Sequence, residues 1–232
     1  VIDDDDLVSR TLQRALKLYD YQVMTANSGI EGLQLARRHR PDLFILDIMM
    51  PGVDGYQVCR QIRGDPLLQD APVLFLTAKA KDEDKIEGFR AGGDDYLVKP
   101  FNMQELELRV KAILRRAGPE KVEDASVNEV VVGNVTLDCR TFKVNTPHGM
   151  ILLTNVQFDL LYHLMSHADQ VFNSQQLLQD VWDYPRDTGS PELERAHIKN
   201  QRERIEPSPA EPIYIKTIQG HGYSFSSEDT RG

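Results

Sequence analysis

The first half of the chain alternates short apolar runs with stretches of helical period, and this alternation limits the folds that it can adopt. The apolar runs cover residues 1–2, 22–25, 43–46, 73–76 and 96–98. The helical stretches cover residues 7–19, 30–38, 56–62, 85–91 and 103–115. Strands that alternate with helices of this length form βαβ units around a parallel sheet. Residues 43–46 are apolar without alternation, which is typical of a central strand buried on both faces.

The second half of the chain has a different pattern. Residues 117–127 are polar and show no period, which predicts a linker. Short apolar runs separated by turns predict antiparallel strands at residues 130–132, 135–137, 142–144 and 150–153. Helical patterns follow at residues 154–167, 174–182 and 191–205, and a terminal hairpin is predicted around Gly220 and Gly222. We therefore expect two domains, residues 1–116 and 128–232, joined by the linker.

Composition sets the broad class of the protein. Of 232 residues, 41% are hydrophobic and 27% charged, as in soluble globular proteins, and no apolar run is long enough to span a membrane. The two cysteines, Cys59 and Cys139, lack the spacing of a metal site, so we expect reduced thiols in a cytoplasmic protein. The net charge is −9, and residues 128–232 carry nine basic and 14 acidic side chains. Any DNA contact must therefore come from a local patch.

Polar side chains follow the apolar runs of the first half. Asp3 and Asp4 follow the first run, Asp47 the third, Thr77 the fourth, and Lys99 the fifth. Because sites in parallel α/β sheets form outside the carboxyl ends of the strands, these side chains should converge. A cluster of carboxylates requires a cation, and an all-oxygen ligand set suits Mg²⁺. Asp47 could then attack a phosphoryl donor, with Lys99 and Thr77 holding the phosphoryl oxygens.

Four motifs carry these residues: VIDDD at residues 1–5, LDIMMPGVDG at 46–55, LTA at 76–78 and YLVKPF at 96–101. Together they resemble the motifs of bacterial receiver domains over residues 1–116. The resemblance implies a (βα)5 flavodoxin-like fold in which Asp47 is the phosphoacceptor, Thr77 and Tyr96 move together on phosphorylation, and Lys99, before a cis peptide bond to Pro100, pairs with the phosphoryl group. The implied Mg²⁺ ligands are Asp4, Asp47, the backbone carbonyl of Met49 and, through water, Asp3. The family has more apolar residues before the acidic pair, so we expect a few N-terminal residues to be missing.

The last two helices of the first domain, with the strand between them, carry charged residues. In OmpR/PhoB-type regulators, which this part of the chain resembles, such residues form ion pairs across a two-fold receiver homodimer. The resemblance assigns to this face Lys85, Asp94, Asp95, Glu105 and Arg109. Arg90 and Lys111 depart from the pattern, because the family often pairs an acid with a base there. Single surface ion pairs contribute only ~0–1 kcal/mol, so this face would select a partner more than hold it.

Residues 128–232 resemble the effector domain of the same family. The matching pieces are residues 153–154, 158–161, 176–178, 181–182, 197–198 and 217–223. The resemblance implies an α+β winged-helix domain with an N-terminal antiparallel β platform. Its helix at 191–205 would enter the major groove of double-stranded DNA, and its terminal hairpin would reach the neighbouring minor groove or backbone. The implied DNA-binding residues are Arg195, His197, Lys199, Asn200, Arg202, Arg204, Thr217, Gln219 and His221.

Several residues of this domain depart from the family pattern. Gln157 replaces a usual glutamate, Gln201 occupies a usually apolar core position, and Gln219 stands where the wing usually has arginine. Glutamates at 192, 194 and 203 dilute the positive charge of the DNA-facing helix. Because each lost phosphate contact removes part of the affinity, we expect weak binding by a monomer, strengthened by dimerisation on paired half-sites.

These features predict a two-component response regulator, a DNA-binding transcriptional regulator activated when a sensor histidine kinase phosphorylates Asp47. RNA polymerase is a further candidate partner, and no membrane partner is expected. Apart from its own phosphorylation and dephosphorylation, we expect no enzymatic activity. A haloacid-dehalogenase-type phosphatase is the alternative from another class, but that chemistry needs a second acid where this chain has Met49. A regulator that ignores phosphate and responds to a partner protein also stays open.

Overall fold

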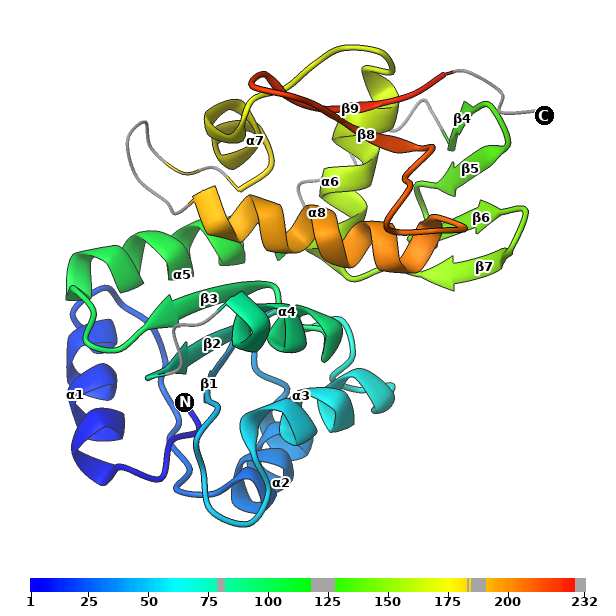
Figure 1. Ribbon diagram of the computed structural model, residues 1–232. Helices are drawn as coiled ribbons and strands as arrows, with labels where there is room; N and C mark the ends of the chain where they lie inside the picture. The colour runs from blue at the N-terminus through cyan, green and yellow to red at the C-terminus, as the bar shows by residue number, and fades with distance from the viewer. Residues whose placement is uncertain (79–81, 118–127, 183, 185–190, 228–232) are drawn as a thin grey trace. The chain divides into compact units, whose positions relative to one another are not determined.

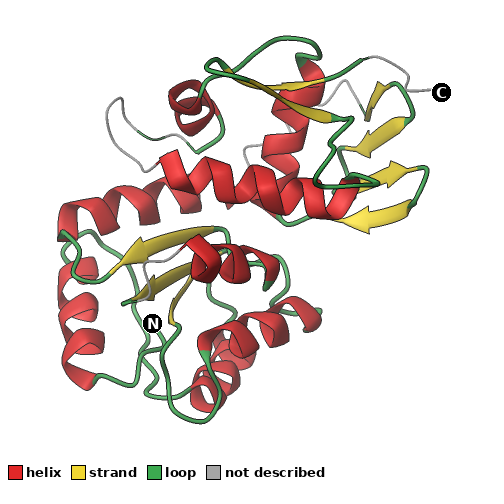
Figure 2. Ribbon diagram, in the orientation of Figure 1, coloured by secondary structure: helices red, strands yellow, loops and turns green. Residues whose placement is uncertain are grey.

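The computed structural model describes residues 1–78, 82–117, 128–182, 184 and 191–227 (Figure 1). The chain divides into two compact units, Val1–Ala117 and Gly118–Gly232. Both units mix helices and strands (Figure 2). No helix in the described part of the chain is both long and apolar enough to cross a membrane.

The first unit is a parallel sheet with helices on both faces. In chain order its elements are α1 (Asp6–Lys17), α2 (Gly29–His39), β1 (Phe44–Asp47), α3 (Gly55–Gly64), β2 (Val73–Thr77), α4 (Asp82–Arg90), β3 (Asp95–Val98) and α5 (Met103–Ala117). The sheet order is β1-β2-β3, and both pairings are parallel. This is the α/β architecture that the alternating pattern predicts.

The two faces of the sheet are buried by different helices. Leucines and isoleucines of β1, β2 and β3 form one cluster with Leu12 and Leu16 of α1 and Leu106 and Val110 of α5. On the other face, the ring of Phe75 packs edge-on against Tyr56 of α3 at 5.6 Å. All four residues of β1 and all five of β2 are buried, as expected for strands covered on both faces.

Two of the five predicted strands are not regular strands in the structure. Ile2 makes isolated parallel bridges with Ala26 on one side and with Leu46 of β1 on the other. Backbone groups of residues 1–3 bond to those of Met24 and Ala26, and this pairing is too short to count as a ladder. A cavity of about 400 Å³ lies beside it, lined mainly by residues 20–26 and 39–45.

The second unit begins with an antiparallel sheet and continues with three helices and a hairpin. Its elements are β4 (Glu129–Val132), β5 (Val135–Asp138), β6 (Lys143–Thr146), β7 (Gly149–Leu152), α6 (Asn155–Ser166), α7 (Ser174–Asp180), α8 (Pro191–Ile205), β8 (Ile215–Ile218) and β9 (Gly222–Phe225). The first four strands pair in sequence order, and β8 pairs with β9. This is the predicted β platform followed by a winged helix.

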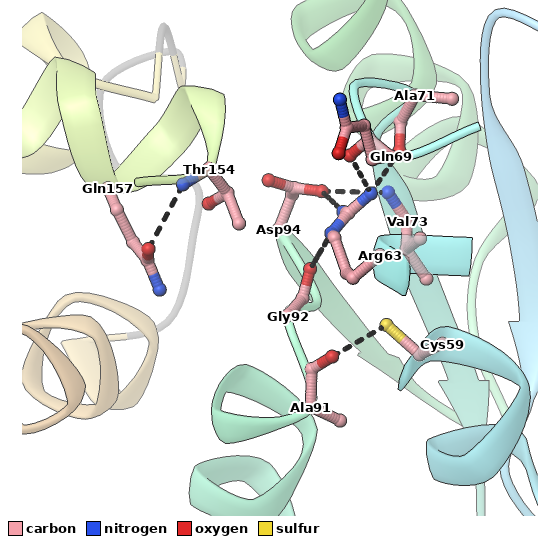
Figure 3. Close-up of polar contacts among 10 residues, drawn as sticks. All are labelled: Cys59, Arg63, Gln69, Ala71, Val73, Ala91, Gly92, Asp94, Thr154 and Gln157. Carbon is pink, nitrogen blue, oxygen red and sulfur yellow. Dashed lines mark hydrogen bonds and ion pairs between the residues drawn. The ribbon is translucent and has the colours of Figure 1, made fainter. Parts of the chain in front are cut away.

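Local sequence explains where the helices and the hairpin begin. α6 begins after Thr154, whose backbone N–H donates to the side chain of Gln157 (Figure 3). This is the interaction that a glutamate makes at the third position of a capping box, so Gln157 retains it. Gly222 has φ +135°, and a Cβ there would lie 1.9 Å from the carbonyl oxygen of Phe172. Only glycine fits this position, where the wing crosses close to the segment before α7.

Candidate functional site

Three carboxylates meet where β1 ends in the first unit. Asp47 is the last residue of β1, while Asp3 and Asp4 lie just before α1. Asp5 is the N-cap of α1 and accepts hydrogen bonds from the N–H groups of Leu7 and Val8. One carboxylate oxygen each of Asp3, Asp4 and Asp47 lie within 4.8 Å of one another, so the group could hold a metal ion. The predicted convergence is present.

The ammonium of Lys99 lies against two of these carboxylates. Lys99 Nζ is 2.6 Å from Asp3 Oδ2 and 3.2 Å from Asp47 Oδ1. The second oxygen of Asp3 accepts the backbone N–H of Asp5, so both of its carboxylate oxygens have partners, while Asp4 is exposed. The peptide bond from Lys99 to Pro100 is cis, as the resemblance implies.

The charges in this pocket shift one another's pKa. Burial raises the pKa of Asp47; Lys99 opposes that shift, the charges of Asp3 and Asp4 add to it, and the net change is upward. Burial alone would lower the pKa of Lys99, but its hydrogen bond with Asp3 and the charge of Asp47 outweigh burial and raise it. Lys99 therefore stays protonated and offers a fixed positive charge beside Asp47.

The loop after β1 folds back toward Asp47. The N–H of Gly55, the first residue of α3, donates to the carbonyl of Ile48 at 3.0 Å. A Cβ on Gly55 would lie 2.2 Å from the carbonyl oxygen of Asp47, so glycine is required for this approach. The side chain of Met49 is mostly exposed. Its thioether is a soft ligand that hard cations disfavour, so its backbone carbonyl is the part that could serve as a ligand.

Thr77 and Tyr96 lie on neighbouring strands, and their hydroxyl groups are hydrogen-bonded to each other. Both side chains are buried, and burial raises the pKa of Tyr96. The ring of Tyr96 lies 6.4 Å from that of Phe75, centroid to centroid. The predicted pair is therefore in direct contact, at the end of β2 beside the carboxylate pocket.

One residue of the predicted dimer face points into the first unit instead of to its surface. Asp94 is buried, and its carboxylate accepts from Arg63 of α3 at 2.7 Å and from the N–H of Val73 at 2.8 Å (Figure 3). Arg63 also donates to the carbonyl oxygens of Gly92, Gln69 and Ala71. The expectation that Asp94 is a surface residue is thus corrected, because its carboxylate is buried and bound to Arg63 and Val73 of its own unit.

The remaining charges of that face are linked within one chain. Arg109 of α5 donates to Asp95 at 2.9 Å and to Glu105, one turn earlier on the helix, at 2.7 Å. Asp95 and Arg109 are buried, while the Glu105 side chain is about half exposed. Arg90 and Lys111 are exposed. Lys85 lies within α4, but its side chain is outside the described part of the chain.

In the second unit, α8 presents only part of its polar surface. Glu192, Arg195 and Lys199 are exposed, at a spacing that puts them on one side of the helix. On the wing, Thr217, Gln219 and His221 are exposed as well. These residues keep the exposure that DNA binding requires.

Three of the predicted DNA-binding residues of α8 belong to other sides of the helix. His197 is 2% exposed, and its ring lies 5.0 Å from that of Trp182. Asn200 is also buried and accepts from the side-chain amide of Gln157 at 2.8 Å. Arg204 donates to the carbonyl of Leu152 on β7. Helical period puts the three side chains away from the Arg195 face. The burial of His197 and Asn200 corrects the expectation for these two residues, whereas that for the partly exposed Arg204 stays a prediction.

Arg202 lies on the Arg195 side of α8 but is half-buried and bonded to the wing. Its Nε and Nη2 donate to the carbonyl oxygen of Ile215, and Nη2 also donates to Thr217 Oγ1. One turn later, the carboxylate of Glu206 accepts backbone N–H groups at the start of β8. Sequence reasoning did not select Glu206; its one visible signal is the four-residue spacing from Arg202.

Comparisons with known proteins assign each half of the chain. Residues 1–111 match the model of the response regulator receiver domain, and residues 148–225 match that of the C-terminal domain of transcriptional regulatory proteins. The DNA-binding dual master transcriptional regulator RpaA of Synechocystis is 38% identical over 234 residues, covering 100% of this chain and 96% of that protein. The alkaline phosphatase synthesis transcriptional regulatory protein PhoP of Bacillus subtilis is 39% identical over 230 residues, covering 97% and 95%.

The solved structure of a RitR mutant agrees in fold. It has a TM-score of 0.72 at 23% identity and covers 97% of this chain and 96% of its own. The two domain matches, the two relatives and the geometry of both units agree. The chain belongs to the OmpR/PhoB-type family of two-component response regulators, DNA-binding transcriptional regulators that phosphorylation of the receiver activates.

Proposed function

We propose that Asp47 is the residue that accepts the phosphoryl group from a sensor histidine kinase. One observation carries this assignment: Lys99 bridges Asp3 and Asp47 in a pocket where the three carboxylates converge. A carboxylate oxygen of Asp47 attacks the phosphorus atom, and an acyl phosphate bond forms. The bond between phosphorus and the histidine nitrogen of the kinase breaks, and its electron pair stays on that nitrogen. Lys99 Nζ then pairs with a phosphoryl oxygen, and the Thr77 hydroxyl donates to another.

The residues present suit Mg²⁺, because every side chain in the cluster offers a hard oxygen ligand. Asp4, Asp47 and the carbonyl of Met49 would hold the ion directly. Asp3 would act through water, since both of its oxygens already accept hydrogen bonds. When bound, the ion would offset the negative charge of the carboxylates and of the phosphoryl oxygens.

A mass measurement tests the phosphosite. Incubated with acetyl phosphate and Mg²⁺, the full chain should gain the mass of one phosphoryl group, and Asp47→Asn should gain none. Asp42→Asn, an exposed aspartate just before β1, is the matched control and should behave as wild type. A phosphoryl group gained by Asp47→Asn would contradict the assignment.

Asp4→Ala should bind Mg²⁺ more weakly than wild type, because the change removes a direct ligand.

Phosphorylation also drives, in this proposal, a homodimer through the face made by α4, β3 and α5. The network of Arg109 with Asp95 and Glu105 supports it, since these charges are held in fixed positions beside that face. The dimer places two winged-helix units on paired half-sites of double-stranded DNA, and RNA polymerase is the candidate partner of the bound dimer.

A further inference from the structure

Arg202 donates hydrogen bonds to the wing from its Nε and Nη2. Its Nε lies 2.9 Å and its Nη2 2.6 Å from the carbonyl oxygen of Ile215, the first residue of β8. The same Nη2 lies 2.7 Å from Thr217 Oγ1. The guanidinium carbon is 5.8 Å from the centre of the Tyr223 ring on β9, so Arg202 contacts both strands of the hairpin.

Glu206 completes the attachment from one turn further along the chain. Its carboxylate accepts the N–H groups of Ile213, Tyr214 and Ile215 at 2.7–3.1 Å. Ile215 is therefore held at both of its backbone groups, its N–H by Glu206 and its carbonyl by Arg202. Bonds between charged and neutral groups are among the stronger hydrogen bonds in proteins.

The bond to Thr217 also orients a hydroxyl group. Thr217 Oγ1 accepts from Arg202 and is exposed, and within the described part of the chain Thr217 donates no side-chain hydrogen bond of its own. A hydroxyl that accepts on one side keeps its hydrogen for an acceptor on another. With Arg202 fixing the oxygen, that hydrogen can be donated to an anionic oxygen outside the protein.

We propose that Arg202 is a positioning residue for DNA binding: it holds the wing on α8 and orients Thr217 to donate to a DNA phosphate, and does not itself read the DNA. Lysine cannot replace it, because one ammonium on a flexible stem does not reproduce the planar fork that reaches Ile215 and Thr217 together. The inference rests on DNA binding by this unit, which the first step of its test checks separately.

The test is a double-mutant cycle on the full phosphorylated chain. An operator is first selected from random-sequence DNA with wild-type protein, and failure at this step would count against DNA binding itself. Affinities are then measured for Arg202→Met, Thr217→Val and the double variant. We expect each single variant to bind DNA about tenfold more weakly, a loss of ~1.4 kcal/mol. The double variant should bind little more weakly than either single variant, because each change alone already removes the contact between Thr217 and the phosphate.

Lys199→Met is the matched control, because Lys199 is exposed on the same side of α8. The affinity that Lys199→Met loses should add to the affinity that Thr217→Val loses. Lys199→Met should also make DNA affinity less dependent on salt, as the loss of a phosphate contact does. Arg202→Lys, which keeps the charge, should bind as weakly as Arg202→Met and lose hydroxyl-radical protection where the wing meets DNA. If Arg202→Lys binds like wild type, or if the Arg202→Met and Thr217→Val losses add, Arg202 contacts DNA directly and the proposal is wrong. Should Arg202→Met fail to fold, the cycle is run with Arg202→Lys.

Discussion

Gln201 lies in α8 with a fully buried side chain, and replacing it with leucine should stabilise the second unit. The residue is 0% exposed. Neither its Nε2 nor its Oε1 has a hydrogen-bond partner among the described residues. A buried amide without partners has lost its hydrogen bonds to water and gained none in return. The family's apolar residue at this position avoids that cost.

The expected gain follows from the two unpaired atoms. Leaving a buried donor or acceptor unsatisfied costs about 1–3 kcal/mol, and leucine has a similar volume to glutamine without the polar atoms. We therefore expect Gln201→Leu to raise the free energy of unfolding of the second unit by ~1–3 kcal/mol. In a domain of roughly 100 residues, each kcal/mol raises Tm by about 4–8 °C.

Calorimetry of the full chain can measure this change. The transition of the second unit should move upward, while that of the first unit stays in place, because the two units are compact separately. Lys199→Leu, at an exposed position of the same helix, controls for the helix propensity of leucine and should change Tm little. An unchanged or lowered Tm for Gln201→Leu would mean that buried water satisfies the amide, and the reasoning would fail.

Three further changes have expected outcomes. Burial raises the pKa of Glu194 above its ordinary value of 4.5, so protonated Glu194 stabilises the fold fully below pH 4.5, and this stability is lost as pH rises through the pKa of the folded state. Glu194→Gln should remove the resulting fall in Tm with pH, and a variant whose Tm still falls in the same way would contradict this reasoning. Glu105→Ala with Arg109→Ala should weaken phosphorylation-dependent dimerisation; sedimentation that shows the same dimer would exclude this face. Gln219→Arg should tighten DNA binding by roughly 1 kcal/mol at low salt and steepen its salt dependence, unless the wing lies off the DNA.

The carboxylate pocket could be predicted from sequence because its residues stand at the ends of strands. Asp47 and Thr77 end neighbouring parallel strands, and Lys99 follows the third strand, so the topology alone brings them to one edge. Helix α8 offers no such signal. Polar residues occur on every side of it, and the structure buries some of them with polar partners, as in the pair Asn200–Gln157. Hydrophobic period therefore could not separate its buried side from its DNA-facing side.

Asp94 and Asp95 show the same limit at the edge of a strand. Both look like surface acids in the sequence, yet each is buried against an arginine from a different helix, Arg63 on α3 and Arg109 on α5. Buried carboxylates keep their charge only when such partners meet them. Whether an arginine contacts a buried carboxylate depends on tertiary packing. The spacing of residues along the chain does not indicate that Arg63 contacts Asp94.

The acidic charge of the second unit makes dimerisation the step that controls DNA occupancy in our proposal. On the exposed side of α8, the positive charges of Arg195 and Lys199 are opposed by Glu192 and by the half-exposed Glu203. Arg202 is hydrogen-bonded to the wing, so few other cations on this side of α8 are available to release counterions from DNA. We therefore expect one copy of this unit to bind weakly, and two linked copies to gain the effective concentration that one lacks. In this proposal, phosphorylation acts on transcription by bringing a second copy of the DNA-binding unit to the DNA.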